Sequence, residues 1–359
     1  MQDRVLIALT SHDRLGDTGR STGAYLPEAA LPWRVFTDAG FAVDLVSVQG
    51  GPPPMIGSAD DPDVRAFLDD PHIAAQLADA PRAEALDPSD YRAIFYAGGH
   101  GTMWDFPEAH GLAALASRIY AAGGVVSAVC HGPAGLLPVR LPDGRPLVDG
   151  KAVAAFTDEE EADQQLTDIV PFLLAPALAA LGARPQPGAR YQPRVVTDGR
   201  LVTGQNPASS AGVAHAVVRV LRGEVDDDAV PVVSDVVTLE GTLRAYVAAP
   251  VDGGGDGVIV GPTLFGVDGH ARALADRLAG TGRIAVVPDP YHRAAPLVAL
   301  RADDAGRARG RELLGGLTRE EVAADLGLAA GGLRARGAGR VDMVGVSSGG
   351  HLAWIGAAL

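Results

Sequence analysis

Apolar residues occur in short runs, separated by longer segments in which they recur with helical spacing. Runs without a polar side predict strands that are buried on both faces of a sheet, and the segments between them predict helices. The predicted strands of the first 222 residues are 5–9, 42–48, 93–96, 125–129, 153–156, 194–197 and 201–203, and the predicted helices lie within 22–39, 64–77, 112–122, 172–181 and 207–221. This alternation predicts a mainly parallel α/β sheet with helices on both faces, with ligands bound at the carboxyl ends of the strands.

The run 125–129 leads directly into Cys130 and His131. Gly132 and Pro133 end the strand, and Pro133 is suited to the first position of a helix. Cys130 should therefore lie in a strand-to-helix turn, where the helix start is expected to lower the pKa of the thiol. His131 could carry a proton for it. The alternative is a buried Cys that only packs, but the turn favours a catalytic thiol.

Composition narrows the classes of function. The 359 residues allow two or three domains, and a formal charge of −14 argues against nucleic acid or an anionic membrane as partner. No apolar run approaches the ~20 residues of a membrane span, and the run 5–9 is too short for a signal peptide. A single cysteine excludes an internal disulfide and fits a reducing, cytoplasmic location. No residues stand at metal-ligand spacing, so we expect no metal.

Four separated motifs occur in a specific order. They are Thr22-Gly-Ala-Tyr-Leu-Pro-Glu28-Ala-Ala-Leu-Pro32, Ala97-Gly-Gly-His-Gly101, Ala128-Val-Cys-His-Gly-Pro133 and Thr197-Asp-Gly-Arg-Leu-Val-Thr-Gly-Gln-Asn-Pro-Ala208. Together they resemble the PfpI superfamily, kin to class I glutamine amidotransferase domains. The nearest branch is that of glutathione-independent glyoxalases, some of which are described as heat-shock chaperones. The resemblance covers residues 1–222 and implies a flavodoxin-like parallel sheet sandwiched by helices; we also expect a homodimer.

The resemblance also implies residue roles. Cys130 would be the nucleophile, His131 its neighbour in a triad, and Glu28 an acid against the thiol that moves substrate protons. The third triad member would come from the acidic run 158–161, where the motif register favours Glu161 over Asp158. At least two of these four acids should belong to a solvated loop.

Two more positions border the expected site. Gly99, with the amides of Cys130 and His131, could donate hydrogen bonds to an oxyanion. His100 is either a group of the substrate pocket or a structural turn residue.

The implied reaction converts methylglyoxal, a small 2-oxoaldehyde, to lactate. The thiolate would form a hemithioacetal, a carboxylate and the His would move a proton from C1 to C2, and hydrolysis of a thioester would release lactate. This is a glyoxalase III-type lyase (a D-lactate dehydratase) that needs no metal or organic cofactor. The alternatives are a holding chaperone and a protein or nucleotide deglycase. Glutamine hydrolysis would require a synthase partner domain, which the sequence does not show.

A second region with a different set of motifs begins after a charged linker, 223–229. Residues 230–359 contain predicted strands at 241–250, 258–261, 284–287 and 341–345 and a helix at 270–279. The last strand precedes Gly345-Val-Ser-Ser-Gly349, a G-x-S-x-G turn that exposes its serine, Ser347, before a helix. With the segment 288–293 this turn resembles the dienelactone hydrolase family. That family often has Cys in place of Ser347, and Thr263 here replaces the acid of its Glu-x-Phe-Gly turn.

The acid and His of an α/β-hydrolase follow the nucleophile on later strands. Only nine residues follow Gly350, and His351 lies on the same helix as Ser347 rather than on a return loop. We therefore expect a truncated α/β-hydrolase half-domain that is catalytically silent, with Ser347 as a vestigial nucleophile.

Overall fold

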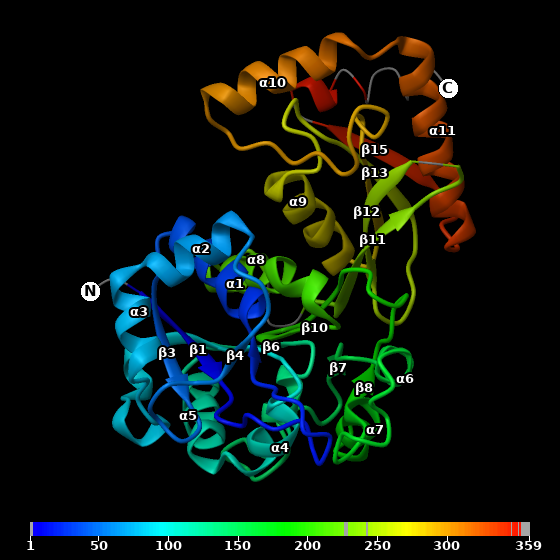
Figure 1. Cartoon of the computed structure of the whole chain (residues 1–359). Coiled ribbons are helices and arrows are strands. Elements are labelled where there is room, and N and C mark those ends of the chain that lie inside the picture. Colours follow the sequence, from blue (N-terminus) through cyan, green and yellow to red (C-terminus); the bar gives the residue numbers. More distant parts are fainter. Residues whose placement is uncertain (1–2, 226–228, 242, 346, 351, 353–359) are drawn as a thin grey trace. The chain divides into compact units, whose positions relative to one another are not determined.

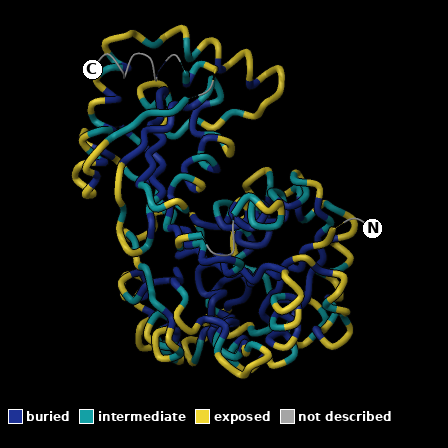
Figure 2. The backbone as a smooth tube through the Cα atoms, turned by 180° about the vertical axis from the view of Figure 1, so that it is seen from behind, coloured by how far each residue is buried: buried dark blue, intermediate teal, exposed yellow. Residues whose placement is uncertain are grey.

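The computed structural model describes residues 3–225, 229–241, 243–345, 347–350 and 352 (Figure 1). The chain divides into two compact units, Met1–Asp227 and Asp228–Leu359. Figure 2 shows the buried residues in the interior of each unit and the exposed residues at its surface. Among the described residues, no helix combines the length and the apolar character that crossing a bilayer would require.

The sheet of the first unit has the strand order β9-β10-β6-β5-β1-β3. Its strands are β1 (Arg4–Leu9), β3 (Ala42–Ser47), β5 (Tyr91–Tyr96), β6 (Val125–Val129), β9 (Arg194–Asp198) and β10 (Leu201–Gly204). All neighbours pair in parallel except β9 and β10, which form an antiparallel hairpin at one edge. Two small parallel pairs lie outside this sheet: β2 (Ala24–Tyr25) with β4 (Met55–Ile56), and β7 (Ala152–Val153) with β8 (Arg184–Pro185).

Helices cover both faces of this sheet. They are α1 (Leu26–Asp38), α2 (Pro62–Asp69), α3 (Pro71–Ala78), α4 (Thr102–Asp105), α5 (His110–Ala121), α6 (Asp158–Asp163), α7 (Leu174–Ala180) and α8 (Ser210–Leu221). Short 3₁₀ helices span Ala83–Ala85, Pro88–Asp90, Phe106–Glu108, Gly132–Leu136 and Pro207–Ser209.

Alternating side chains of β1 build the two cores. Ile7 belongs to the core under α1 and α8, whereas Leu6 belongs to the core under α5. Both are fully buried, which explains why β1 reads as a continuous apolar run. The predicted α/β class is thereby confirmed, with one antiparallel edge strand added.

Three local predictions in the first unit were imprecise. The expected strand 153–156 is reduced to β7, which pairs with β8 rather than joining the main sheet. The expected helix after Pro133 is the 3₁₀ helix Gly132–Leu136. The expected helix 64–77 is two helices, because Asp70 adopts an extended backbone between them and caps α3 with its carboxylate.

The strands of the second unit lie in the order β15-β13-β14-β12-β11. Its strands are β11 (Val232–Thr238), β12 (Arg244–Pro250), β13 (Gly257–Gly261), β14 (Ile284–Pro288) and β15 (Val341–Gly345), and its helices are α9 (Gly269–Gly280), α10 (Asp304–Gly315) and α11 (Arg319–Ala335). The strands β14, β13 and β15 are parallel, whereas β11 and β12 pair antiparallel. The sequence prediction missed β11, α10 and α11.

The sheet of the second unit is also covered on both faces. Ile259 of β13 packs in a core with Leu326 of α11, and Val260 packs in a second core with Ala275 of α9. A mixed sheet covered on both faces, with parallel strands β14, β13 and β15 and a turn after β15, agrees with the predicted α/β-hydrolase character.

Candidate active site

Cys130 occupies a tight turn between β6 and the 3₁₀ helix Gly132–Leu136. Its φ angle is 60°, in the left-handed region that non-glycine residues seldom adopt, and only 4% of the residue is exposed. The turn is held by its neighbours, since the Cys130 amide donates to Gly204 O (2.9 Å) and Phe156 N donates to Cys130 O (2.9 Å). A strained and fixed backbone at the end of a central strand presents the thiol in one direction.

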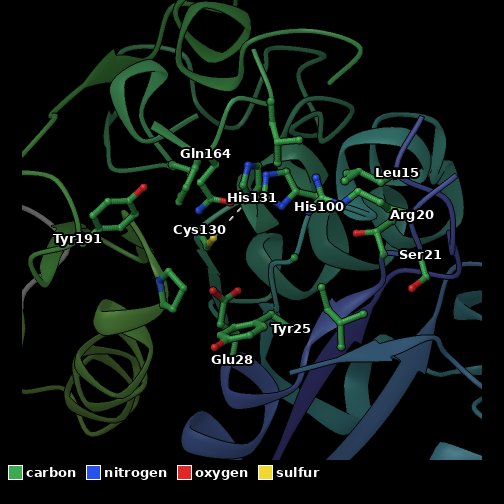
Figure 3. A pocket seen from close by; sticks show the side chains of 16 residues that line it. Leu15, Arg20, Ser21, Tyr25, Glu28, His100, Cys130, His131, Gln164 and Tyr191 are labelled. Carbon is green, nitrogen blue, oxygen red and sulfur yellow. Dashed lines mark hydrogen bonds between the residues drawn. The ribbon is translucent and has the colours of Figure 1, made fainter. Parts of the chain in front are cut away.

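His131 lies beside this thiol with His100 next to it (Figure 3), and the Glu161 carboxylate contacts both rings. His131 Nδ1 is 3.3 Å from Cys130 Sγ, and His131 Nε2 is 2.8 Å from Glu161 Oε2. The other oxygen, Glu161 Oε1, is 2.8 Å from His100 Nε2. The structure thus places Glu161, and not Asp158, against His131, and it places His100 in the pocket rather than in a purely structural turn.

The charge states of Glu161 and His131 determine which atom donates in each of these hydrogen bonds. Burial favours the neutral acid, but hydrogen bonds from His100 and His131 outweigh it and lower the pKa of Glu161 to about 2. A charged carboxylate only accepts, so both Nε2 atoms must donate to it. His131 Nδ1 is then the unprotonated nitrogen that faces the thiol. Burial, with His100 close by, lowers the pKa of His131 to about 4, so the ring is neutral near pH 7 and can accept the thiol proton.

Glu28 lies on the opposite side of the thiol. It stands in the first turn of α1 and is completely buried. Burial raises the pKa of Glu28 to about 8; contacts with the Cys130 thiol and the Gly98 amide oppose this only in part. Neither carboxyl oxygen has a hydrogen bond of good geometry within the described residues. A carboxyl with a pKa near neutral is suited to take and return a proton.

The pKa of the Cys130 thiol is shifted in the opposite direction from the one that the sequence predicted. Burial raises the pKa of Cys130, and the Glu28 carboxylate acts in the same direction, whereas the backbone amides of His131 and Gly99 oppose them. The expected lowering of the thiol pKa by a helix start is therefore wrong for the free site, because the thiol is buried beside an acid and the helix is a single short 3₁₀ segment. Any reaction at this thiol would need a neighbouring base to take its proton.

The oxyanion prediction also changes in one detail. Since the Cys130 amide donates to Gly204 O, it is not free to bind an oxyanion. The amides of His131 and Gly99 already act on the sulfur. The amides of His131 and Gly99 therefore remain the candidate hydrogen-bond donors to an oxyanion.

Two consecutive glycines let the acid and the thiol meet. A Cβ atom on Gly98 would collide with the Glu28 carboxyl and would lie 2.9 Å from Cys130 Cβ. Gly99 has a φ of 102° and would bring a Cβ atom into the backbone of Gly23. The glycine pair after β5 is thus required by close packing and not only by turn formation.

The acidic run 158–161 is the first turn of α6, not a loop. Thr157 caps this helix and forms a reciprocal capping box with Glu160. Glu159 is exposed, as expected for a solvated acid, but Glu160 and Glu161 are buried. Glu160 bonds to the cap residue Thr157, whereas its neighbour Glu161 faces the two histidines.

Glu160 is a buried neighbour of the site that the sequence prediction missed. Its Oε2 accepts from Thr157 N and Oγ1, both at 3.0 Å. Its Oε1 accepts from Tyr191 N (2.7 Å), Asn206 Nδ2 (2.9 Å) and Gln205 Nε2 (3.1 Å). Gln205 and Asn206 belong to the fourth sequence motif, which could have signalled a buried polar contact. Five donors on one carboxylate fasten α6 to two pocket loops.

The site opens into a pocket of about 350 Å³ (Figure 3). Its lining residues are Leu15, Arg20, Ser21, Thr22, Tyr25, Glu28, Ile56, Gly99, His100, Cys130, His131, Phe156, Gln164, Leu166, Tyr191 and Pro207. Five of the six residues predicted for the first site therefore line one cavity, and the sixth, Glu161, contacts two of them, His100 and His131.

A potential metal-ligand set also appears within the described residues. Ligand atoms of His100, His131 and Glu161 lie within 4.8 Å of one another. These residues are far apart in the sequence, so their spacing gave no sign of such a set. Both Nε2 atoms already donate to Glu161, and a cation would have to replace these hydrogen bonds.

Ser347, the predicted nucleophile of the second unit, follows β15. Its φ is 59°, the same left-handed conformation as Cys130, and the residue is exposed. Thr263 uses its hydroxyl to accept from Phe265 N (3.3 Å) within its own turn. His351 lies outside the described residues.

The comparisons with known proteins identify both parts of the chain. The chain belongs to the DJ-1/PfpI family, whose model matches residues 22–220. The model of the dienelactone hydrolase family matches residues 243–359. Both resemblances predicted from the sequence are confirmed.

Several relatives of the first unit are named glyoxalases. The chain is 36% identical over 241 residues to a glutathione-independent glyoxalase of Saccharomyces cerevisiae, covering 61% of this chain and 98% of that protein. The crystal structure of glyoxalase III from Candida albicans is 35% identical, with a TM-score of 0.56, over 61% of this chain and 97% of that one. The Rapid Encystment Protein of Francisella tularensis is 34% identical, with a TM-score of 0.59, over 61% and 99%.

Proposed function

We propose that the first unit converts methylglyoxal to D-lactate without glutathione. The observation that carries this proposal is the single buried thiol of Cys130, with a neutral imidazole on one side and a carboxyl of raised pKa on the other. The glyoxalase names of the relatives support it.

The first step adds the thiol across the aldehyde carbonyl. The Cys130 sulfur forms a bond to C1 while His131 Nδ1 takes the thiol proton and passes it to the carbonyl oxygen, which gives a hemithioacetal. Glu161 keeps the imidazole in the tautomer that this step needs and stabilises the transient imidazolium. The amides of Gly99 and His131 are placed to stabilise negative charge that develops next to the sulfur.

The second step is an internal redox reaction. Glu28, as the carboxylate, accepts the proton from C1 to form an enediol(ate) and returns a proton to C2, so C1 is oxidised to a thioester while C2 is reduced to an alcohol. Water then attacks the thioester carbon, the carbon–sulfur bond breaks, and the sulfur regains its proton. The sum is one methylglyoxal plus one water giving one lactate, with no external oxidant or reductant.

The test is lactate formation by the purified full chain without glutathione, measured with a D-lactate-specific dehydrogenase. We expect one D-lactate for each methylglyoxal consumed, and no acceleration when glutathione is added. Consumption of methylglyoxal without lactate, or a strict need for glutathione, would contradict the proposal.

A further inference from the structure

The loop before β2 holds a positive charge at the pocket. In this loop Leu15 N donates to Arg20 O (3.0 Å) and Thr22 N donates to Asp13 O (2.9 Å). His12 stacks on Trp104 at 5.1 Å, with ring planes 3° apart. These contacts fix the backbone on both sides of Arg20, which lines the pocket together with Cys130 (Figure 3).

Arg20 is the only lysine or arginine among the lining residues. Although the chain carries a formal charge of −14, no carboxylate pairs with Arg20 in the part of the chain that the structure describes. The next two residues, Ser21 and Thr22, also line the pocket, and their hydroxyls form no hydrogen bond with other described residues. A guanidinium and two unused hydroxyls on one wall are the groups that bind carboxylates and phosphates.

The pocket is also larger than methylglyoxal requires. Cavities of roughly 300 Å³ and more enclose drug-sized ligands, whereas methylglyoxal has only five non-hydrogen atoms. With its aldehyde at Cys130, so small a molecule leaves much of the 350 Å³ unfilled.

From these observations we infer that the preferred substrate is a 2-oxoaldehyde with an anionic group at its far end, bound by Arg20, Ser21 and Thr22. The inference rests on the proposed function, because it places the reactive aldehyde at Cys130. The reaction is unchanged: the substrate R–CO–CHO takes up one water and gives the 2-hydroxy acid R–CHOH–COOH. Only the recognition of R is new.

Two substrates of equal backbone length test the inference. They are 4,5-dioxopentanoate, which ends in a carboxylate, and its methyl ester, which is neutral. We expect kcat/KM of the full chain to be about tenfold higher for the carboxylate, a modest value for a charge-assisted hydrogen bond at a partly open site. The preference should shrink as salt is added, because exposed charges are screened.

Three variants locate the effect. Arg20→Gln should reduce the carboxylate-to-ester ratio of kcat/KM to about one, whereas Arg20→Lys should keep part of the preference. Arg14→Gln is the matched control: Arg14 lies on the same loop with its side chain 84% exposed and does not line the pocket. It should keep the wild-type ratio.

Binding of 4-oxopentanoate, which has no aldehyde, separates the inference from the proposed function. Calorimetry should show it binding to the wild type and to Cys130→Ser, and about tenfold more weakly to Arg20→Gln. If methylglyoxal and both test substrates gave no 2-hydroxy acid but this binding difference held, the glyoxalase proposal would fail and the anion site would stand. Equal ratios in the wild type and Arg20→Gln, or equal binding of 4-oxopentanoate, would overturn the anion site whatever the turnover.

Discussion

The two units present the same turn in very different surroundings. Cys130 and Ser347 follow strands β6 and β15 with φ angles of 60° and 59°. Cys130 is nearly buried between His131 and Glu28, whereas Ser347 is exposed and its hydroxyl has no hydrogen-bond partner among the described residues. A strained turn therefore only aims a nucleophile; neighbouring proton acceptors decide whether it reacts.

The largest expected effect comes from removing the proposed nucleophile of the first unit, Cys130. Cys130→Ser should reduce lactate formation by at least about 10³-fold, because a hydroxyl is far less acidic than a thiol and forms no comparable adduct. Circular dichroism should show an unchanged fold. The matched change Ser347→Ala should leave the rate unaltered, and a comparable loss there would break the contrast between the two turns.

Glu28 tests whether a base is needed opposite His131. Glu28→Gln should lower kcat by about 10²-fold, as positioned acid–base groups do. Because the pKa of Glu28 is raised to about 8 and only the carboxylate accepts a proton, the wild-type rate should rise as the pH passes through 8. The Gln variant should lack this rise. An effect on KM alone would make Glu28 a binding residue.

Glu160 tests whether the site depends on the α6 anchor. Glu160→Gln would place an amide NH₂ group against groups that already donate, so hydrogen bonds that hold the Tyr191 loop would be lost. Because Tyr191 and Pro207 line the pocket, we expect kcat to fall by about tenfold and KM to rise. Glu159→Gln is the control, because Glu159 is exposed on the same helix. If both variants behaved alike, Glu160 would have no positioning role.

The buried carboxyl of Glu28 should also lower the free energy of unfolding at high pH. Its pKa is raised in the folded chain from 4.5 to about 8, so the unfolded chain loses this proton first as the pH rises. The free energy of unfolding of the first unit should therefore fall between about pH 4.5 and 8. Denaturant titration should find Glu28→Gln more stable than wild type by a few kcal/mol at pH 9 and similar at pH 4. Equal stability at both pH values would argue against a buried carboxyl of raised pKa.

The smallest expected effect concerns the second unit. We propose that in this chain Ser347 is not an activated nucleophile, since no described side chain is placed to accept its proton. A fluorophosphonate probe should leave the full chain unlabelled, whereas an active serine hydrolase run alongside should be labelled. Stoichiometric labelling of Ser347 would show that a base reaches it.

Much of the first unit was predictable because its signals are local. Buried strands such as β1 and β6 are continuous apolar runs, and the motifs around Glu28 and Cys130 lie at strand and helix ends. The apolar segment 153–156 was wrongly predicted as a strand of the main sheet, because its side chains are buried although only Val153 pairs with another strand, and that strand is β8. The helices α6 and α11 were missed although Thr157 with Glu160 and Thr318 with Glu321 have capping-box spacing.

Other features of the site could not be read from local sequence. The pKa of Cys130 depends on how deeply the thiol is buried and on Glu28, which is about a hundred residues away in the chain. The five hydrogen bonds on Glu160 likewise join three distant segments. Both are products of tertiary packing, which periodicity does not encode.

Cys130 is the only cysteine among the 359 residues. A thiol-directed reagent can therefore label only this residue. The amount of reagent bound at saturation gives the number of reactive Cys130 thiols in a preparation. A thioester trapped by acid quenching would add its mass to a single peptide without a competing thiol. Chemical labelling and turnover can thus both be followed at the same atom, the sulfur of Cys130, without mutating any other cysteine.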